Sequence, residues 1–545
     1  MHRKRRTGWL WLCCMALLLG LLSGCSGNNN NTESGGTASP APTAKGDSGK
    51  QEKAGSDDKP LELTWMRYEH PSQALLTDSV AVQEFLKRQN VKLNVQGVPQ
   101  SNYDDKKKTL IATNTMPDIL LVKQDDIQNF ADSGIFLDLT PYLDDMPNFK
   151  KVIQEQPDIN KNKIDGKLYG FPLAAKKSGS GGQLPMMRID VLKELGLNQP
   201  TTYDELYQVL KKMKEAYPDS YPFTARAANG LTGTENLLNP ITFGFGSGYT
   251  TFNGSKVYYE PETDKYQFGP ESSEFKQAVE WLHMLYKEKL LDPDYSTATS
   301  QIWQEKLSSG KSFYFQDNHG FAGSFNVTLK KVNAEHQFDM LDTLTAPTGA
   351  KRNLIYPKGH LSESYVLNAK LKNPEKAIAF MDWLYSEEGS SLTSLGMEGK
   401  DYTLTNGEYK MADDVYNKYK DEQSPYYSLA SALGLGYLGF GLYEDNRMGV
   451  TWQTEESIRW DDKAAKAEQA GENIRFVSDP PFTMEERERL KQLRSQLDAY
   501  LTQNMDKFIM IEGSMKDWDG FVAELKKKGS DELVSIYNAA LDRVR

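Results

Sequence analysis

The sequence predicts an α/β fold arranged in two lobes. Residues 61–66 and 91–95 alternate between apolar and polar side chains, as half-buried strands do, and residues 77–90 between them carry an amphipathic helix pattern. Residues 118–122 form a short apolar run bounded by polar residues, which is typical of a buried parallel strand. This alternation of strands and helices favours an α/β layer. About 485 residues follow this chain's first 60, and that length predicts a second lobe.

Helix signals continue along the rest of the chain. Thr202 and Glu205 have the spacing of a capping box ahead of an apolar stripe. Residues 275–286 show one apolar stripe, and Asn373 with Pro374 marks the start of a further amphipathic helix. These helices extend the α/β pattern well beyond the first three strands.

The first 24 residues predict a signal peptide for export. Four basic residues at positions 3–6 precede an apolar run at 8–22, which is too short to span a bilayer comfortably. The sequence Leu-Ser-Gly-Cys at 22–25 resembles the bacterial lipobox, which implies a diacylglycerol on Cys25 and cleavage just before it. The alternative is an ordinary signal peptide with an incidental cysteine.

Residues 25–60 predict a disordered tether. This stretch is rich in Asn, Gly, Ser, Thr, Pro and Lys and lacks the apolar side chains that a core requires. No second long apolar run follows, so the lipid is the expected membrane anchor. We therefore expect the protein at the extracellular face of the cell membrane, held there through Cys25.

Composition excludes several classes of function. The net charge of −11 argues against a nucleic-acid partner, because phosphate binding needs clustered Lys and Arg. The cysteines lie at positions 13, 14 and 25, so the folded body has no thiol nucleophile, thiolate metal site or internal disulfide. The histidines are scattered and form no His-Glu-x-x-His pair. We predict no catalytic residue, no metal site and no cofactor.

Several segments, in order along the chain, carry a family resemblance. They are Met-Pro-Asp-Ile-Leu at 116–120, Ile-Asp-Gly-Lys-Leu-Tyr-Gly-Phe-Pro at 164–172, the helix-forming run at 188–206, the segments at 372–377 and 381–389, and Gly-Met-Glu-Gly-Lys-Asp-Tyr at 396–402. Together they resemble the extracellular solute-binding proteins of ABC importers, in particular the large sugar-binding lipoproteins of Gram-positive bacteria.

The resemblance implies a two-lobed periplasmic-binding-protein-like fold of the class II type, with a ligand cleft between the lobes. Residues 61–172 and 356–400 would form the N-lobe, and residues 173–355 and 401–545 the C-lobe. It also implies capture of an oligosaccharide and delivery to the membrane subunits of an ABC permease, without catalysis and by a monomer. The alternatives are a cell-surface glycan hydrolase and a ligand-sensing or peptide-binding lipoprotein.

The resemblance places ligand contacts at the ends of strands. The first and third strands end in charged and aromatic residues: Arg67, Tyr68 and Glu69, and Lys123, Gln124 and Asp125. Such groups suit sugar recognition, because hydroxyls form charge-assisted hydrogen bonds and aromatic faces stack on the apolar face of the ring. The alternative is that they are ordinary solvated loop residues.

Further candidates lie in the second half of the chain. They are Trp303, the strand-end residues Gln316 and Asp317, Tyr356 and His360 at an expected lobe crossover, and Trp452. Arg188 is a cation that could pair with a uronate carboxylate, although it could instead brace the helix that follows it. Because the whole body is acidic, we favour a neutral or mixed oligosaccharide.

One segment departs from the family pattern. Some relatives carry an Asp/Asn-rich calcium loop soon after the helix that begins at Thr202. Here residues 216–222 contain a single acid, Asp219. Because hard cations need several oxygen ligands, structural calcium is not expected at this position.

Overall fold

The computed structural model describes residues 59–69, 75–175, 181–227, 231–251, 255–357, 360–420, 422, 425–436, 440–477 and 479–543. These residues fall within one compact unit, Lys59–Arg545. The predicted signal peptide, Cys25 and nearly all of the predicted tether lie outside the described residues. Within the described part of the chain, no helix combines the length and the apolar character needed to cross a membrane.

The first lobe is built on a sheet of six described strands. Their order across the sheet is β14-β4-β11-β3-β1-β2. The strands are β1 (Leu61–Glu69), β2 (Val91–Pro99), β3 (Ile119–Lys123), β4 (Gly170–Ala175), β11 (His360–Leu367) and β14 (Tyr443–Glu444). Strands β2 and β3 pair parallel to β1, whereas β11 runs antiparallel to both β3 and β4. The strands predicted at 61–66, 91–95 and 118–122 are confirmed.

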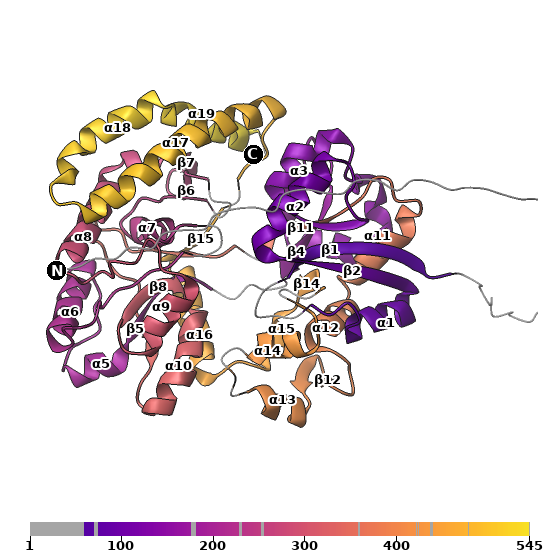
Figure 1. Ribbon diagram of the computed structural model, residues 1–545, viewed down its shortest axis with the longest axis horizontal. Helices are drawn as coiled ribbons and strands as arrows, with labels where there is room; N and C mark the ends of the chain where they lie inside the picture. The colour runs from indigo at the N-terminus through magenta and orange to yellow at the C-terminus, as the bar shows by residue number, and fades with distance from the viewer. Residues whose placement is uncertain are drawn as a thin grey trace, which may run out of the picture. The chain divides into compact units, whose positions relative to one another are not determined.

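Helices pack around this sheet, and segments far apart in sequence meet there (Figure 1). They are α1 (Val80–Gln89), α2 (Gln100–Ala112), α3 (Gln124–Phe130), α4 (Pro147–Glu155), α11 (Pro374–Trp383) and α12 (Glu387–Leu395), with short 3-10 turns at Ala131–Ser133, Thr140–Asp145 and Pro157–Asn162. Trp65 of β1 shows the packing: it is completely buried and meets Tyr365 of β11 and Phe380 of α11 edge-on.

A small group of elements adjoins the first lobe. It contains β12 (Tyr402–Thr405), β13 (Glu408–Met411), α13 (Asp413–Tyr419), α14 (Pro425–Ala432) and α15 (Asn446–Val450), which share a hydrophobic cluster of their own. β14 then pairs with β4 in the first sheet. The first lobe therefore continues to Glu444, beyond the boundary predicted at residue 400, because β14 supplies its edge strand.

The second lobe is built on a sheet ordered β15-β10-β5-β8, with β9 also pairing with β5. Its strands are β5 (Gly182–Arg188), β8 (Tyr314–Asn318), β9 (Phe338–Met340), β10 (Asn353–Ile355) and β15 (Asn473–Arg475), and β6 (Tyr258–Glu260) pairs with β7 (Lys265–Gln267) in a separate hairpin. β10 and β15 are parallel, and β5 runs antiparallel to β10 and β8.

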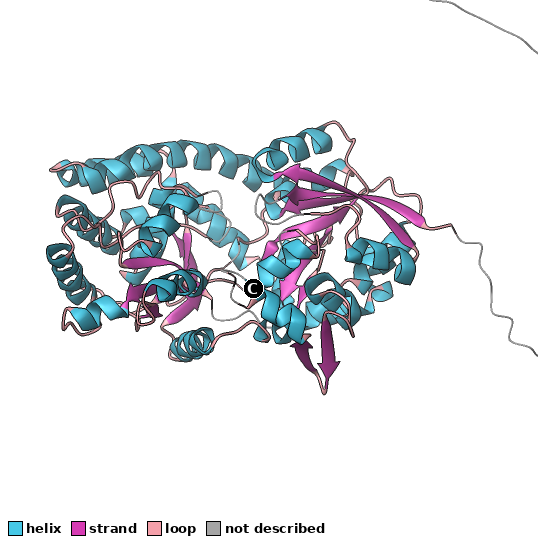
Figure 2. Ribbon diagram, turned by 60° about the horizontal axis from the view of Figure 1, so that its bottom comes forward, coloured by secondary structure: helices cyan, strands magenta, loops and turns pink. Residues whose placement is uncertain are grey.

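Helices enclose the second sheet as well (Figure 2). They are α5 (Ile189–Glu194), α6 (Tyr203–Ala216), α7 (Gly233–Gly244), α8 (Ser273–Lys287), α9 (Ser300–Ser308), α10 (Gly320–Val332), α16 (Glu455–Gln469), α17 (Met484–Met510), α18 (Trp518–Lys527) and α19 (Ser530–Asp542), with 3-10 turns at Gly269–Glu271 and Ser514–Asp517. The long helix α17 packs against α8 and α19. The predicted two-lobed α/β fold is confirmed.

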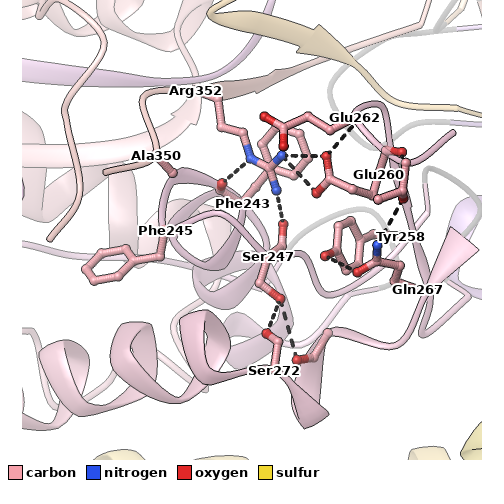
Figure 3. Close-up of polar contacts among 12 residues, drawn as sticks. Phe243, Phe245, Ser247, Tyr258, Glu260, Glu262, Gln267, Ser272, Ala350 and Arg352 are labelled. Carbon is pink, nitrogen blue, oxygen red and sulfur yellow. Dashed lines mark hydrogen bonds and ion pairs between the residues drawn. The ribbon is translucent and has the colours of Figure 1, made fainter. Parts of the chain in front are cut away.

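A buried arginine ties several elements of the second lobe together (Figure 3). Arg352, immediately before β10, donates to the carbonyl of Phe243 at 2.9 Å and to that of Ser247 at 2.8 Å. Its Nη1 also contacts both carboxylate oxygens of Glu260 on β6, at 3.0 and 2.9 Å. Because α7, β6 and the residue before β10 share this one guanidinium, β10 is held in place just before the chain leaves for the first lobe.

Candidate functional site

The first sheet gathers several strand ends at one edge, which we call the N-edge. The parallel strands β1 and β3 end there at Glu69 and Lys123. The antiparallel neighbour β11 begins there at His360, and β4 ends there at Ala175. Carboxyl ends of parallel strands at one edge are where ligands bind in α/β sheets.

The second sheet has a corresponding edge, which we call the C-edge. β5 begins there at Gly182, which lies opposite Ile355 at the end of β10. Asn318 at the end of β8 pairs with Gln183, and β15 ends beside them at Arg475. The chain crosses between the two lobes three times: after β4 and after β10, where it joins the two edges, and after α15. The candidate site therefore lies where the two edges are joined.

Among the residues predicted at the end of β1, Arg67 is fully buried. Its guanidinium lies over the ring of Phe440 at 5.8 Å. Tyr68 is 9% exposed and meets Tyr103 edge-on, with ring centroids 5.7 Å apart, whereas Glu69 is partly exposed. The structure therefore places Arg67 beneath the N-edge, and Tyr68 and Glu69 nearer its surface.

The turn from β3 to α3 contains the other three predicted contacts. Lys123 is exposed and its Nζ lies 3.3 Å from Asp104 of α2. Gln124 is 5% exposed and donates through Nε2 to the carbonyl of Asn162 at 3.1 Å. Asp125 is exposed. Two of these side chains therefore face solvent, and Gln124 ties the turn to the rest of the lobe.

Asp125 of the first lobe interacts electrostatically with charged residues of the second lobe. Although its side chain is exposed, the surrounding protein raises the pKa of its carboxyl group, and the negative Asp479 adds to this effect while Arg494 opposes it. Asp479 and Arg494 belong to the second lobe, where Arg494 Nη2 lies 3.3 Å from Asp479 Oδ2. The charge state of Asp125 therefore depends on residues of both lobes.

A direct contact joins the lobes close to this point. Arg487 of α17 donates to Asp132 of the first lobe, with Nη2 3.4 Å from Oδ2. A second bond, from Arg487 Nη1 to the carbonyl of Phe482 at 2.8 Å, holds the guanidinium in place. Neither α17 nor its charged residues were expected at the site, because no sequence pattern connects them with the distant β3–α3 turn.

At the C-edge, Asp317 is the centre of a buried polar network. Its carboxylate accepts from Arg226 Nε at 2.9 Å and from Nη2 at 3.3 Å, and Asn236 donates to it at 3.0 Å. Gln316 beside it is 5% exposed and accepts from the Tyr314 hydroxyl at 3.0 Å. Both predicted residues are at the C-edge, where they support the surface from within the lobe.

Trp303 is placed differently from the expectation of a ligand contact. It is 0% exposed. The rings of Phe315, Phe321 and Phe325 surround it edge-on at 5.3 Å, and the Arg226 guanidinium lies over it at 4.7 Å. The prediction was wrong because aromatic residues before a strand serve cores as readily as ligands, and α9 turns this ring inward.

Arg188 is also not a ligand contact in this structure. It lies at the end of β5 opposite the C-edge and is 4% exposed. Its Nε and Nη2 donate to Asp190 at 2.8 and 2.5 Å, and this pairing lowers the pKa of Asp190 against the effect of burial. The alternative stated from the sequence, a brace for the following helix, describes its role correctly.

The remaining predicted residues lie at the crossings. Tyr356 follows β10 and its carbonyl accepts from Arg475 Nη1 at 2.9 Å. His360 begins β11, and its side chain is outside the described set. Trp452 follows α15, is partly exposed, and stacks on the ring of Tyr416 at 5.8 Å. All three therefore occupy segments that join the two lobes.

One histidine at the C-edge was not predicted. His319 follows β8, is 8% exposed, and its Nε2 lies 3.7 Å from Asp461 of α16. A side chain added at Gly181 would come within 3.6 Å of its ring. A lone histidine after a strand carries no sequence signal of its own.

Among the described residues, the structure contains no group of three or more His, Cys, Asp or Glu side chains arranged to hold a metal ion.

These features describe a two-lobed α/β protein whose candidate site lies at the lobe crossings. A family model described as bacterial extracellular solute-binding protein matches residues 73–390, and the chain belongs to this family. The lipoprotein LipO of Bacillus subtilis is 25% identical over 461 residues, covering 82% of this chain and 85% of LipO. The polygalacturonan/rhamnogalacturonan-binding protein YtcQ of Bacillus subtilis is 25% identical over 500 residues, covering 87% of this chain and 91% of YtcQ.

A solved structure shows the same fold. The alginate-binding protein AlgQ2, crystallised without calcium ion, superposes with a TM-score of 0.74 at 21% identity, covering 89% of this chain and 98% of that protein.

At the position where the sequence lacks a calcium loop, Lys214 Nζ donates to the carbonyls of Pro218 and Ser220 at 2.7 and 2.6 Å. An ammonium group therefore binds two backbone carbonyls of this segment, those of Pro218 and Ser220.

Proposed function

We propose that this chain is the lipid-anchored substrate-binding subunit of a carbohydrate ABC importer. It binds an oligosaccharide between the N-edge and the C-edge and delivers it to the permease subunits in the membrane. The observation that carries this proposal is the meeting of polar and aromatic strand ends from two sheets at three chain crossings. The relatives named for pectin-type and alginate polysaccharides support a sugar ligand.

The proposed contacts divide into two groups. The first group is proposed to meet the ligand directly: Tyr68, Glu69, Lys123, Asp125, Tyr356, His360 and Trp452, with Asp479 and Arg494 added from the second lobe. Buried residues shape the site from beneath: Arg67, Gln124, Gln316 and Asp317. Carboxylates and guanidinium groups then bind hydroxyls, and rings stack on the sugar. The protein acts as a monomer and without catalysis, cofactor or nucleic acid.

The ligand is a neutral or mixed oligosaccharide. Three cations near the edges already contact carboxylates: Arg226 contacts Asp317, Arg475 contacts Glu468, and Lys123 contacts Asp104. A uronate carboxylate would have to compete with these partners, whereas neutral hydroxyls can be bound by both members of each pair. This arrangement favours ligands whose hydroxyl groups provide most of the contacts.

A thermal-shift screen tests the proposal. A ligand present at about 100 times its dissociation constant adds roughly 2.7 kcal/mol to the stability of the folded chain, which is easily seen as a higher Tm. We expect stabilisation by neutral or mixed oligosaccharides. Stabilisation by galacturonides alone, lost in Lys123→Ala, would show that charge specifies the ligand. Sustained release of reducing sugar by the purified chain would establish a hydrolase instead.

A further inference from the structure

A lysine ammonium group is buried beneath the β3–α3 turn. Lys107 lies in α2, and its side chain is 2% exposed. Its Nζ lies 2.6 Å from Asp126 Oδ2 and 2.8 Å from Asp104 Oδ1, and 5.8 Å from the centre of the Tyr103 ring. These neighbours raise the pKa of Lys107 even though burial acts against the charged form. The side chain is therefore a permanent cation inside the first lobe.

The acidic partner of this lysine holds the turn itself. Asp126 is 5% exposed and lies in the first turn of α3. Its Oδ2 accepts the backbone N–H of Lys123 at 2.9 Å, which closes the turn between β3 and α3. The same oxygen is the one that meets the Lys107 ammonium group. The position of the turn therefore depends on a carboxylate that the Lys107 ammonium group holds in place.

The second partner of Lys107 reaches the same turn by another route. Asp104 uses Oδ1 for Lys107 and Oδ2 for the exposed Lys123, at 3.3 Å. Tyr103, one residue earlier, donates to the carbonyl of Leu121 in β3 at 2.6 Å. Lys107 thus connects α2 to both ends of the turn that contains Lys123, Gln124 and Asp125.

We infer that Lys107 is a positioning residue for ligand binding, acting through Asp126 on the turn at 123–125. This inference rests on the proposed function, which uses that turn to contact an oligosaccharide. Without the ammonium group, Asp126 would be a buried charge with no cation, and such a charge is expelled towards water at a large cost. The turn would then spend less time in the binding geometry, and the apparent affinity would fall with that fraction.

Removal of both charges distinguishes positioning from general stabilisation. In Lys107→Met the carboxylate of Asp126 is left without its cation, whereas in the double variant Lys107→Met/Asp126→Asn neither charge remains. An amide oxygen at position 126 can still accept the N–H of Lys123. Replacing both members of a buried pair is often nearly neutral, whereas breaking it is costly. Ligand affinity should therefore recover in the double variant.

The experiment is a calorimetric titration of the full-length chain and its variants. The probe is whichever of kestose, a galacturonan oligosaccharide and an alginate oligosaccharide the unmodified chain binds most tightly. The matched control is Lys108→Met, because Lys108 is the exposed neighbour on the same helix. Circular dichroism establishes that each variant is folded.

We expect Lys107→Met to weaken binding roughly tenfold or more, the double variant to recover most of this loss, and Lys108→Met to stay within about twofold. If Lys107→Met does not fold, the double variant is compared with Asp126→Asn alone, which should bind with near-normal affinity because Lys107 keeps its contact with Asp104. A tenfold loss in the double variant but not in Asp126→Asn would then show that Lys107 does not act through Asp126. Unchanged affinity in folded Lys107→Met, or equal losses in the single and double variants, would overturn the inference. If the unmodified chain binds none of the probes, the proposed function itself fails.

Discussion

The ionised carboxylate of Asp125 destabilises the folded chain, and the same residue has a proposed role in ligand binding. Its pKa is raised in the folded chain, so the ionised carboxylate is less favourable there than in the unfolded chain. Ionised Asp125 therefore lowers the free energy of unfolding at neutral pH. This destabilisation is lost as the pH falls through the raised pKa and the carboxyl group becomes protonated. Residues that weaken a fold in this way are often functional.

Asp125→Asn separates the two effects. We expect the free energy of unfolding at pH 7 to stay the same or rise, because the charge next to Asp479 is removed. Oligosaccharide affinity should fall roughly tenfold, because a charge-assisted hydrogen bond is lost. Thermal denaturation and calorimetry measure these quantities, with the exposed Asp105→Asn as the control. Full affinity in Asp125→Asn would remove Asp125 from the proposed site.

Cys25 is the proposed anchor, and its replacement tests localisation alone. Cys25→Ala should release the chain into the medium or leave it unprocessed, since the thioether to the lipid can no longer form. Ligand affinity should be unchanged, because the described site lies within residues 59–543. Cell fractionation and mass spectrometry of the N-terminus provide the measurement. A variant that remains lipidated in the membrane fraction would contradict the proposed lipobox.

At the level of elements, the start of α6 shows how a sequence signal becomes structure. The predicted capping residue Thr202 accepts the backbone N–H of Glu205 at 3.1 Å. The return bond differs from a capping box, because the Glu205 carboxylate accepts from the backbone and hydroxyl of Thr201 at 2.8 Å. These bonds lower the pKa of Glu205, with the backbone of Thr201 as the largest cause.

Thr202→Ala should therefore destabilise the second lobe modestly. Loss of an N-cap hydroxyl costs about 1 kcal/mol. Chemical denaturation followed by circular dichroism measures the change. The control is Thr328→Ala, since Thr328 is exposed within α10 and alanine is the better helix former there. Equal stability of Thr202→Ala and the unmodified chain would mean that the cap contributes nothing at this helix.

The sequence predicted elements better than contacts. The strands that begin at Leu61 and Val91 were predicted because alternation of apolar and polar residues records which face is buried. Lys123 and Asp125 could be placed at a sheet edge because they follow the apolar run at 118–122, which is typical of a buried strand. Arg188 could have been assigned correctly from Asp190, only two residues away.

Other features of the site depend on the tertiary arrangement. Trp303 was placed at the ligand because composition does not reveal that Phe315, Phe321 and Phe325 would converge on it. Arg494 approaches Asp125 from a helix hundreds of residues later. Such pairings leave no local pattern, since they arise only when two lobes have folded.

At the scale of the whole molecule, an ion pair between described residues links the lobes. Arg487 and Asp132 have side chains that are 10% and 46% exposed, and their closest atoms are 3.4 Å apart. A pair that is half exposed is worth about 0.5 kcal/mol and weakens in salt. The pair therefore favours the observed arrangement of the lobes slightly, without fixing it.

A double-mutant cycle measures this link. Asp132→Asn and Arg487→Gln should each reduce oligosaccharide affinity about twofold, and the double variant should lose little more than either single variant. Raising the salt concentration should reduce the coupling. Strictly additive losses at low salt would show that the two side chains do not cooperate in ligand capture.

The central claim is that the chain binds an oligosaccharide without cleaving it. Calorimetric titration of the full-length chain with oligosaccharides tests this claim most directly, when the sugar is recovered afterwards and its mass is measured by mass spectrometry. We predict saturable binding of one oligosaccharide per chain, with the ligand recovered intact. Recovery of shortened sugars would show that the protein is an enzyme. An absence of binding across neutral, mixed and uronic oligosaccharides would contradict its assignment as a sugar-binding subunit.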